Sequence, residues 1–517
     1  MADRVKKSII NAKVNLLFYF LGLFFAFLSR KVFLDYLGDE FVGLTGTLGS
    51  ILGYLNLAEF GVGSSISYFL YKPLQSKDKE KIEEILSLFG YLYRWIGIII
   101  LGAGIIISCF FPIIFNDENI SFPLVYFAFY SFLCSSLIGY FINYRQIILS
   151  ADQKNYLISL YFHSAGFVKV GLQILLAYIY GNPFVWITIE LMFGVIGCIL
   201  LNWRIKKEYP WLRTNKSAGR QLIKKYPEVI KNTKRVFIHQ LKNFFLGKSD
   251  ELFVFMFASL NMVVYYINYT MIIDKVSVIY KSAFDGVAAG IGNLVAEGEK
   301  ENILKVFWEM NTIRHFVAGF ICYSVYLLIH PFISLWLGPE YILDNTILII
   351  LLVYTYITIS RGVIDMFNHA YGLYADVWSA WTELILNISI TFTIGYYYGI
   401  IGIVVGKLFS VFFISVFWKP YYLYHSGFHL SVSKYWNGAI RNYLISILSF
   451  FSAFIICNQF SINPYKSFID WIIYALIVIP VYLIINLSAL YFFAKGAKDF
   501  CYRVKPTLVR IINLFRK

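Results

Sequence analysis

Charged side chains occur at intervals inside long apolar runs of this 517-residue chain, and they are the residues whose chemistry stands out. A charge in the apolar core of a bilayer is costly, so such residues face a polar interior and are candidates for function. Basic groups there suit an anionic ligand, and the donor fork of arginine suits phosphate. The cations nearest the middle of their runs are Arg30, Lys169, Lys248, Lys275 and Arg361, with Arg314 and Lys407 at intermediate depth and Arg145 near one end.

Carboxylates also occur inside the apolar runs. Some have a basic neighbour, because Asp274 precedes Lys275, and Asp365 follows Arg361 by four residues on one helix face. For any single cation, an ion pair facing the protein interior is the plain alternative to a binding role. So many charges together require a hydrated cavity. The carboxylates are Glu59, Glu190, Asp250, Glu251, Asp274, Asp285, Glu309, Asp365 and Glu383.

The apolar runs predict an all-α integral membrane protein. The chain is 59% hydrophobic and 15% charged, with a mean hydropathy of +0.65. A bilayer-spanning helix needs about 20 mostly apolar residues, and the sequence supplies about 14 such segments. They lie at 14–37, 41–71, 85–115, 122–150, 156–180, 183–205, 235–259, 261–295, 304–336, 341–370, 376–398, 400–424, 438–460 and 469–493.

The distribution of basic residues predicts the orientation. If the N-terminus is cytoplasmic, nearly all loop lysines and arginines fall on that side, and the opposite loops carry only Lys466. This bias indicates an even number of spans with both termini in the cytoplasm. The formal net charge of +15 is therefore explained by topology, and we expect no nucleic-acid partner. The first apolar run is too long for the core of a signal peptide, so we read it as retained.

The chain contains an internal repeat. "KDKEKI" in the first half corresponds to "GEKENI" in the second, "ADQKNYLISLY" to "ADVWSAWTELI" and "YIYG" to "YYYG", in the same order. An even number of spans per half predicts parallel repeats that form two pseudo-symmetric six-helix bundles with a site between them, an arrangement that serves alternating access. We assign an N-lobe at 1–215, a cytoplasmic linker at 216–234, a C-lobe at 235–428, and two further helices with a basic tail at 429–517.

Enzymatic chemistry has little support. The sequence has no GxSxG, HExxH or Walker A motif, and its seven histidines are scattered. Its six cysteines include no CxxC pair, so a disulfide framework or a zinc site is not expected. We expect no metal and no organic cofactor. Without a nucleotide-binding domain, energy would come from an ion gradient, the membrane potential or the gradient of the cargo.

Four segments together resemble a known family. They are "LAEFGVGSSISYFLYKPLQSKDKEKI", "INYRQIILSADQKNYL", "KSDELFVFMFASLNMVVYYINYTMII" and "GNLVAEGEKENI". In this order they look like the Wzx-type polysaccharide flippases of O-antigen and capsule synthesis, which belong to the multidrug/oligosaccharidyl-lipid/polysaccharide exporter superfamily. The resemblance covers nearly the whole chain.

The resemblance implies a V-shaped fold of two lobes in the bacterial inner membrane. It implies transport of undecaprenyl-diphosphate-linked oligosaccharide from the cytoplasmic to the outer leaflet, for O-antigen, capsule or exopolysaccharide. The partners would be this lipid, the membrane lipids and the polysaccharide polymerase and chain-length machinery, and we expect a monomer. By analogy with related flippases, cavity cations would hold the diphosphate. These candidates are Arg30, Arg145, Lys169, Lys248, Arg314 and Arg361.

The same resemblance suggests further roles. Asp250, Glu251 and Asp365 are candidates for coupling to Na⁺ or H⁺. Gly61, Gly63 and Ser64 would allow close approach or bending of the second span, and "KDKEKIEEI" would form a helix on the cytoplasmic surface as a gate or lever, or else a solvated connector.

Two alternatives stay open. A cation-coupled multidrug exporter of the same superfamily would favour an acidic cavity, because many of its substrates are cationic. A membrane glycan polymerase or ligase would also handle lipid-linked sugars, but we would expect it to carry a large external loop.

Overall fold

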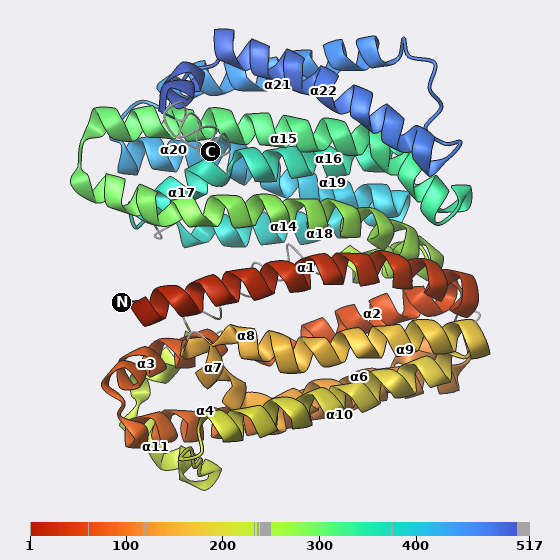
Figure 1. Cartoon of the computed structure of the whole chain (residues 1–517), viewed down its shortest axis with the longest axis vertical. Helices are drawn as coiled ribbons and strands as arrows, with labels where there is room; N and C mark the ends of the chain where they lie inside the picture. Colours follow the sequence, from red (N-terminus) through yellow and green to blue (C-terminus); the bar gives the residue numbers. More distant parts are fainter. Residues whose placement is uncertain are drawn as a thin grey trace, which may run out of the picture. The chain divides into compact units, whose positions relative to one another are not determined.

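The computed structural model is helical in all the regular structure that it describes. It describes residues 2–503 except 60–61, 117–119, 153, 232, 235–236, 238–249 and 374–375. The chain divides into two compact units, 1–264 and 265–517. Each unit is a set of long helices, coloured red to yellow-green and green to blue in Figure 1.

The first unit contains the elements up to the start of α14. Four short turns lie between its helices: 3-10 turns at Asn56–Glu59, Asn143–Gln146 and Lys216–Ala218, and a π-helical turn at Ser159–His163. The helices are α1 (Ala2–Leu37), α2 (Asp39–Leu55), α3 (Val62–Ser76), α4 (Lys79–Ser108), α5 (Phe111–Ile114), α6 (Phe122–Phe141), α7 (Ile147–Ala151), α8 (Asn155–Ile158), α9 (Ser164–Tyr180), α10 (Pro183–Glu208), α11 (Gly219–Lys225) and α13 (Asp250–Phe257).

The second unit contains most of α14 and the elements after it. Two π-helical turns, at Phe412–Trp418 and Leu423–Gly427, flank its shortest helix. The helices are α14 (Leu260–Glu297), α15 (Lys300–Trp336), α16 (Asn345–Ser360), α17 (Gly362–Ala370), α18 (Val377–Tyr398), α19 (Ile400–Val411), α20 (Lys419–Tyr422), α21 (Ser433–Cys457) and α22 (Phe468–Phe493).

Ten helical stretches among the described residues are long and apolar enough to cross a membrane. The chain is therefore a multi-pass membrane protein. Four of the predicted spans are not among the ten. The segment 41–71 is divided between α2 and α3, 235–259 is described only in part, and 261–295 and 376–398 carry charged and amide side chains within α14 and α18. The predicted count of fourteen rests on the sequence alone.

The expected surface helix at "KDKEKIEEI" is not a separate element. The segment begins α4, which continues without a break for 30 residues, and Ile82 and Ile85 are buried. Its acidic side chains find partners beyond α10. Glu83 accepts a hydrogen bond from the backbone of Arg213 at 2.6 Å, and Glu84 pairs with Lys225, the last residue of α11, at 2.6 Å. These contacts allow the charged turns to continue into α4, so the segment is helical, as expected, but is part of a longer helix.

Turns with left-handed backbone recur at matching positions of the two halves. Lys77 and Gly298 have φ of 57° and 79°, and both precede a long helix, α4 or α15. Gly181 and Gly399 have φ of 54° and 56° and follow α9 and α18. Because these pairs are 221 and 218 positions apart, they support the internal repeat read from the sequence.

Two aspartates anchor matching corners. Asp152 accepts a hydrogen bond from the hydroxyl of Tyr209 at 2.8 Å, just after α10 ends. Asp376 accepts one from the ammonium of Lys419 at 2.6 Å, at the start of α20. Each aspartate belongs to the repeated "AD" sequence, so the two halves tie down the end of their sixth predicted span in the same way.

Helices α21 and α22 pack on α15 within the second unit, where Figure 1 shows them alongside. The contacts are close because glycines face large side chains. Gly438 lies against Trp308, and Gly319 lies against the hydroxyl of Tyr482. The ring of Tyr482 stacks on Tyr323 at 4.5 Å. These small-to-large contacts dock the last two helices on the unit.

Candidate functional site

A cavity of about 570 Å³ in the second unit brings together three of the predicted residues, Arg314, Arg361 and Asp365. We call it the arginine cavity. Helices α14, α15, α16 and α17 supply its walls. Its other lining residues are Tyr280, Phe284, Gly292, Thr358, Gly362, Met366, His369 and Ala370.

Arg314 is fixed by neutral groups on three helices. Its side chain on α15 is largely buried, and one terminal nitrogen donates to the hydroxyl of Tyr280 and, at 3.3 Å, to the carbonyl of Ile359. The other terminal nitrogen lies 2.8 Å from the sulfur of Met366. The guanidinium sits over the ring of Phe284 at 4.5 Å. Cation–π contact and hydrogen bonds hold its position without removing its charge.

Arg361 lies at the junction of α16 and α17 and is held by two carboxylates. Its Nε is 3.6 Å from Asp365, and its Nη1 is 3.9 Å from Glu383 and donates to the hydroxyl of Ser415. The side chain of Asp365 is 36% exposed, whereas that of Glu383 is 1% exposed. Asp365 is therefore the more accessible of the two carboxylate partners.

Gly362 makes room for Arg314. A Cβ atom at this position would overlap the guanidinium group of Arg314. The absence of a side chain lets α15 bring its arginine against the junction of α16 and α17. This role of Gly362 could not be predicted from the sequence, because the two residues are far apart along the chain.

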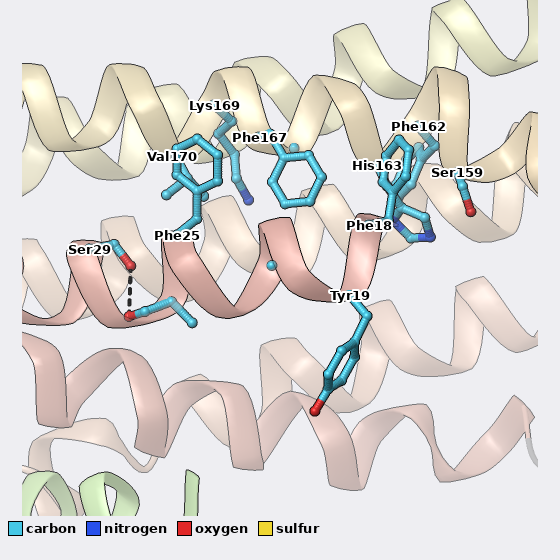
Figure 2. A pocket seen from close by; sticks show the side chains of 13 residues that line it. Phe18, Tyr19, Phe25, Ser29, Ser159, Phe162, His163, Phe167, Lys169 and Val170 are labelled. Carbon is cyan, nitrogen blue, oxygen red and sulfur yellow. Dashed lines mark hydrogen bonds between the residues drawn. The ribbon is translucent and has the colours of Figure 1, made fainter. Parts of the chain in front are cut away.

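A second cavity, of about 620 Å³, lies in the first unit between α1 and α9. Figure 2 shows the rings of Phe25 and Phe167 between the two helices, and Tyr19 extending away from α9. We call it the α1–α9 cavity. Its other lining residues are Phe18, Gly22, Ala26, Ser29, Ser159, Phe162, His163, Gly166, Lys169 and Val170.

Lys169 is the only predicted cation in the lining of this cavity. Its ammonium donates to Glu190 on α10 at 2.6 Å, and the other oxygen of Glu190 accepts from Gln173 at 3.0 Å. The plain reading of Lys169 as a satisfied ion pair therefore holds, and the pair borders the α1–α9 cavity.

Glu59 lies at a break in the second predicted span, in the 3-10 turn between α2 and α3. Its carboxylate accepts hydrogen bonds from Tyr93 and, at 2.7 Å, from Tyr140. The amide oxygen of Asn56 also accepts from Tyr140, at 2.9 Å. Two tyrosines on α4 and α6 thus hold a carboxylate inside the first unit.

The repeat relates this group to the arginine cavity. The shift of 221 positions that aligns Lys77 with Gly298 also aligns Glu59 with Tyr280 and Tyr93 with Arg314. In both units the aligned pair forms a hydrogen bond. The repeat therefore places an acid–tyrosine pair in one unit and a tyrosine–arginine pair in the other, a signal that was already present in the sequence.

Two of the predicted cations lie outside both cavities. Arg30 on α1 donates to the carbonyl of Val264 at 3.3 Å. Arg145 lies in the 3-10 turn after α6 and donates to the hydroxyls of Thr214 at 3.0 Å and Tyr144 at 3.3 Å. Each of these arginines therefore has a hydrogen-bond partner within the first unit.

The proposed coupling residues are divided between the units. Asp250 and Glu251 begin α13 in the first unit, where Asp250 is buried and Glu251 accepts from Ser50 at 2.8 Å. Asp365 lies in the arginine cavity. Lys248 lies outside the described residues.

The small residues proposed for bending follow the break at Asn56–Glu59. Gly63 and Ser64 lie in the first turn of α3, and Gly61 lies outside the described residues. A side chain at Gly63 would meet the hydroxyl of Tyr93 at an ordinary contact distance of 3.6 Å. Gly63 is therefore not required for close packing.

A charged cluster joins the loop after α7 to the end of α10. Lys154 pairs with Asp152 at 2.6 Å and with Glu208 at 2.9 Å. Burial lowers the pKa of Lys154, but the hydrogen bonds and charges of the two carboxylates outweigh it, so its pKa is raised above 10.5. Burial and the charge of Asp152 also raise the pKa of Tyr209.

The fold resembles those of solved helical membrane transporters. No family model matches the sequence, and no curated protein matches it significantly. Among solved structures, lipid II flippase MurJ in an inward closed conformation matches with a TM-score of 0.62 and 17% identity, covering 93% of this chain and 99% of that chain. An inward-facing multidrug resistance MATE family transporter of the MOP superfamily matches with a TM-score of 0.56 and 15% identity, covering 76% and 92%. At these identities the likeness establishes the fold.

Proposed function

We propose that this protein is a flippase that moves an undecaprenyl-diphosphate-linked oligosaccharide across the bacterial inner membrane, for the synthesis of a surface polysaccharide. The arginine cavity carries the proposal. It places two guanidinium groups, Arg314 and Arg361, on one hollow of a membrane protein, and guanidinium binds phosphate oxygens through paired donors.

The two arginines would act differently. Arg314, which lies over the ring of Phe284, would donate to one phosphate oxygen. Arg361 would exchange its long ion pair with the half-exposed Asp365 for a second oxygen, while the buried Glu383 keeps it in place. Release of the diphosphate would restore the ion pair between Arg361 and Asp365. The carboxylate of Asp365 would thus compete with the diphosphate for Arg361.

A third cavity suits the lipid part. It measures about 500 Å³ and lies between α21 and α22 in the second unit, with mainly apolar walls. Leu444, Leu448 and Ile485 line it, and Arg441 is its one charged lining residue. An isoprenoid chain on these apolar side chains would stay out of the polar interior.

Glu59 would couple transport to protons. A carboxylate inside a membrane span that is held by tyrosine hydroxyls can bind a proton, because the tyrosines serve as donors to the anion or as acceptors from the acid. The candidates Asp250, Glu251 and Asp365 remain alternatives for coupling to H⁺ or Na⁺.

The test is complementation in a strain that lacks its own polysaccharide flippase. Arg314→Ala and Arg361→Ala should abolish surface glycan and accumulate lipid-linked intermediate in the cytoplasmic leaflet. Arg94→Ala, which removes an exposed arginine from α4, is the matched control and should behave as wild type. Full activity of both cavity variants at wild-type expression would reject the arginine cavity as the diphosphate site.

Multidrug export is the second candidate, and the fold match to a MATE transporter favours testing it. Many substrates of a multidrug exporter would be cations, and the two arginines in the arginine cavity would repel them. Wild-type protein that raises resistance to cationic dyes, without restoring surface glycan, would support the exporter instead.

A further inference from the structure

The function proposed above assigns one cavity to the diphosphate and one to the lipid. It assigns no site to the oligosaccharide and no role to the α1–α9 cavity. We propose that this cavity binds sugar rings of the lipid-linked oligosaccharide. The inference rests on the proposed flippase function and adds a third binding site, which lies in the first unit of the chain.

The aromatic lining is the first support. Phe167 on α9 lies 5.3 Å from Phe25 and 5.4 Å from Phe18, both on α1. The pair Phe25 and Phe167 is nearly parallel, at 22°. These rings form a strip between the helices, as Figure 2 shows. Sugar rings present a face of C–H groups with partial positive charge, which packs on the negative face of an aromatic ring.

Missing side chains create the space next to this strip. Gly22 on α1 and Gly166 on α9 both line the cavity, and a Cβ atom built at either position would have no neighbour within 4 Å. Open space therefore lies in front of both glycines. The volume of about 620 Å³ falls within the range of small-molecule sites.

Polar groups at the wall favour a sugar over an alkyl chain. Lys169 and its partner Glu190 form a charged pair at the edge, and Ser159 and His163 come from the π-helical turn before α9. π-helical turns are rare and frequently mark functional sites. An isoprenoid chain would desolvate these groups without compensation, whereas sugar hydroxyls can donate to them and accept from them.

Cavity-filling variants provide the test. Gly22→Leu and Gly166→Leu would place a side chain in the open space without meeting backbone, so we expect both to fold. Gly102→Leu on α4 is the matched control, because its Cβ also meets nothing within 4 Å and it lies outside the cavity. Phe167→Leu removes an aromatic face but keeps an apolar side chain.

Binding would be measured on purified full-length protein with two probes. One is the lipid-linked oligosaccharide extracted from source cells that lack this protein, where untransported intermediate accumulates, and the other is undecaprenyl diphosphate without sugar. We expect Gly22→Leu, Gly166→Leu and Phe167→Leu to weaken binding of the glycan-bearing lipid about tenfold. Binding of the sugar-free lipid, and both affinities of Gly102→Leu, should not change.

The other outcomes overturn the proposal in distinguishable ways. If the cavity variants bind both probes with wild-type affinity, the cavity does not contact the sugar. An equal loss for both probes would assign the cavity to the lipid or the diphosphate. If wild-type protein binds neither probe, the flippase function itself fails, and the sugar site fails with it.

Discussion

The position of Arg314 depends on a residue without a side chain. Gly362 permits the guanidinium group to lie against the junction of α16 and α17. Gly362→Ala should push Arg314 out of place, lower transport to the level of Arg314→Ala and destabilise the protein by about 1–3 kcal/mol through overpacking. Surface-glycan complementation and thermal unfolding in detergent would measure both effects.

A matched glycine provides the control for this prediction. Gly139→Ala on α6 introduces the same methyl group into open space and should leave transport and stability unchanged. If Gly362→Ala transports at the wild-type rate, the observed position of the Arg314 guanidinium group is not needed for function.

Two substitutions of Glu59 distinguish the role of its charge from the role of its hydrogen bonds. Glu59→Gln keeps oxygen and nitrogen atoms for Tyr93 and Tyr140 but cannot take up a proton at neutral pH. Glu59→Ala removes this partner from the buried hydroxyl of Tyr93, at a cost of about 1–3 kcal/mol, whereas Tyr140 can still donate to Asn56. We expect Glu59→Ala to unfold at lower temperature than Glu59→Gln, which stays close to wild type.

Transport should separate the same two variants from wild type. If Glu59 carries the coupling proton, both variants lose the dependence of glycan-lipid transport on an imposed pH gradient in proteoliposomes. Coupling that persists in Glu59→Gln would remove Glu59 from that role and return attention to Asp250, Glu251 and Asp365.

At the scale of elements, the corner between α7 and α10 has a predictable pH dependence. Lys154 has a raised pKa in the folded protein, so its contribution to stability is complete below its ordinary pKa of 10.5 and is lost as the pH rises through the raised value. Lys154→Met removes hydrogen bonds to Asp152 and Glu208, which at about 1.5–3 kcal/mol each for charged groups should lower the unfolding temperature at pH 8.

The difference between Lys154→Met and wild type should therefore shrink as the pH is raised above 10.5. Unfolding of both proteins in detergent, followed from pH 8 to pH 11.5, measures this trend. A gap that stays constant or widens would show that Lys154 acts through packing of its carbon chain and not through its charge.

At the scale of the whole molecule, the loop charges predict the orientation in the membrane. The exposed cysteines Cys109, Cys134 and Cys501 would first be changed to serine. A single cysteine at the exposed Glu340 should then react with an impermeant maleimide on intact spheroplasts, and one at the exposed Lys300 should react only after lysis. Reaction of both positions from outside would contradict the predicted orientation.

The sequence predicted elements better than contacts between them. The helical fold class follows from apolar run length, and the pair of Arg361 with Asp365 follows from helical spacing. The pair of Lys169 with Glu190 joins two helices, and Arg314 lines the same cavity as Arg361 only through the packing of α15, so neither could be derived from spacing. The continuity of the charged segment with α4 could not be predicted for the same reason, because Lys225, the partner of Glu84, lies about 140 positions away at the end of α11.

The aligned pairs Glu59–Tyr93 and Tyr280–Arg314 have a consequence for the ancestry of the chain. A transporter made of two identical halves would carry the same charge twice at this position, either two acids or two arginines. If the two halves arose by duplication, their divergence left a carboxylate bonded to a tyrosine in one half and an arginine bonded to a tyrosine in the other. We therefore expect that a gene fusion of either half with itself, which would lack either Glu59 or Arg314, does not restore transport.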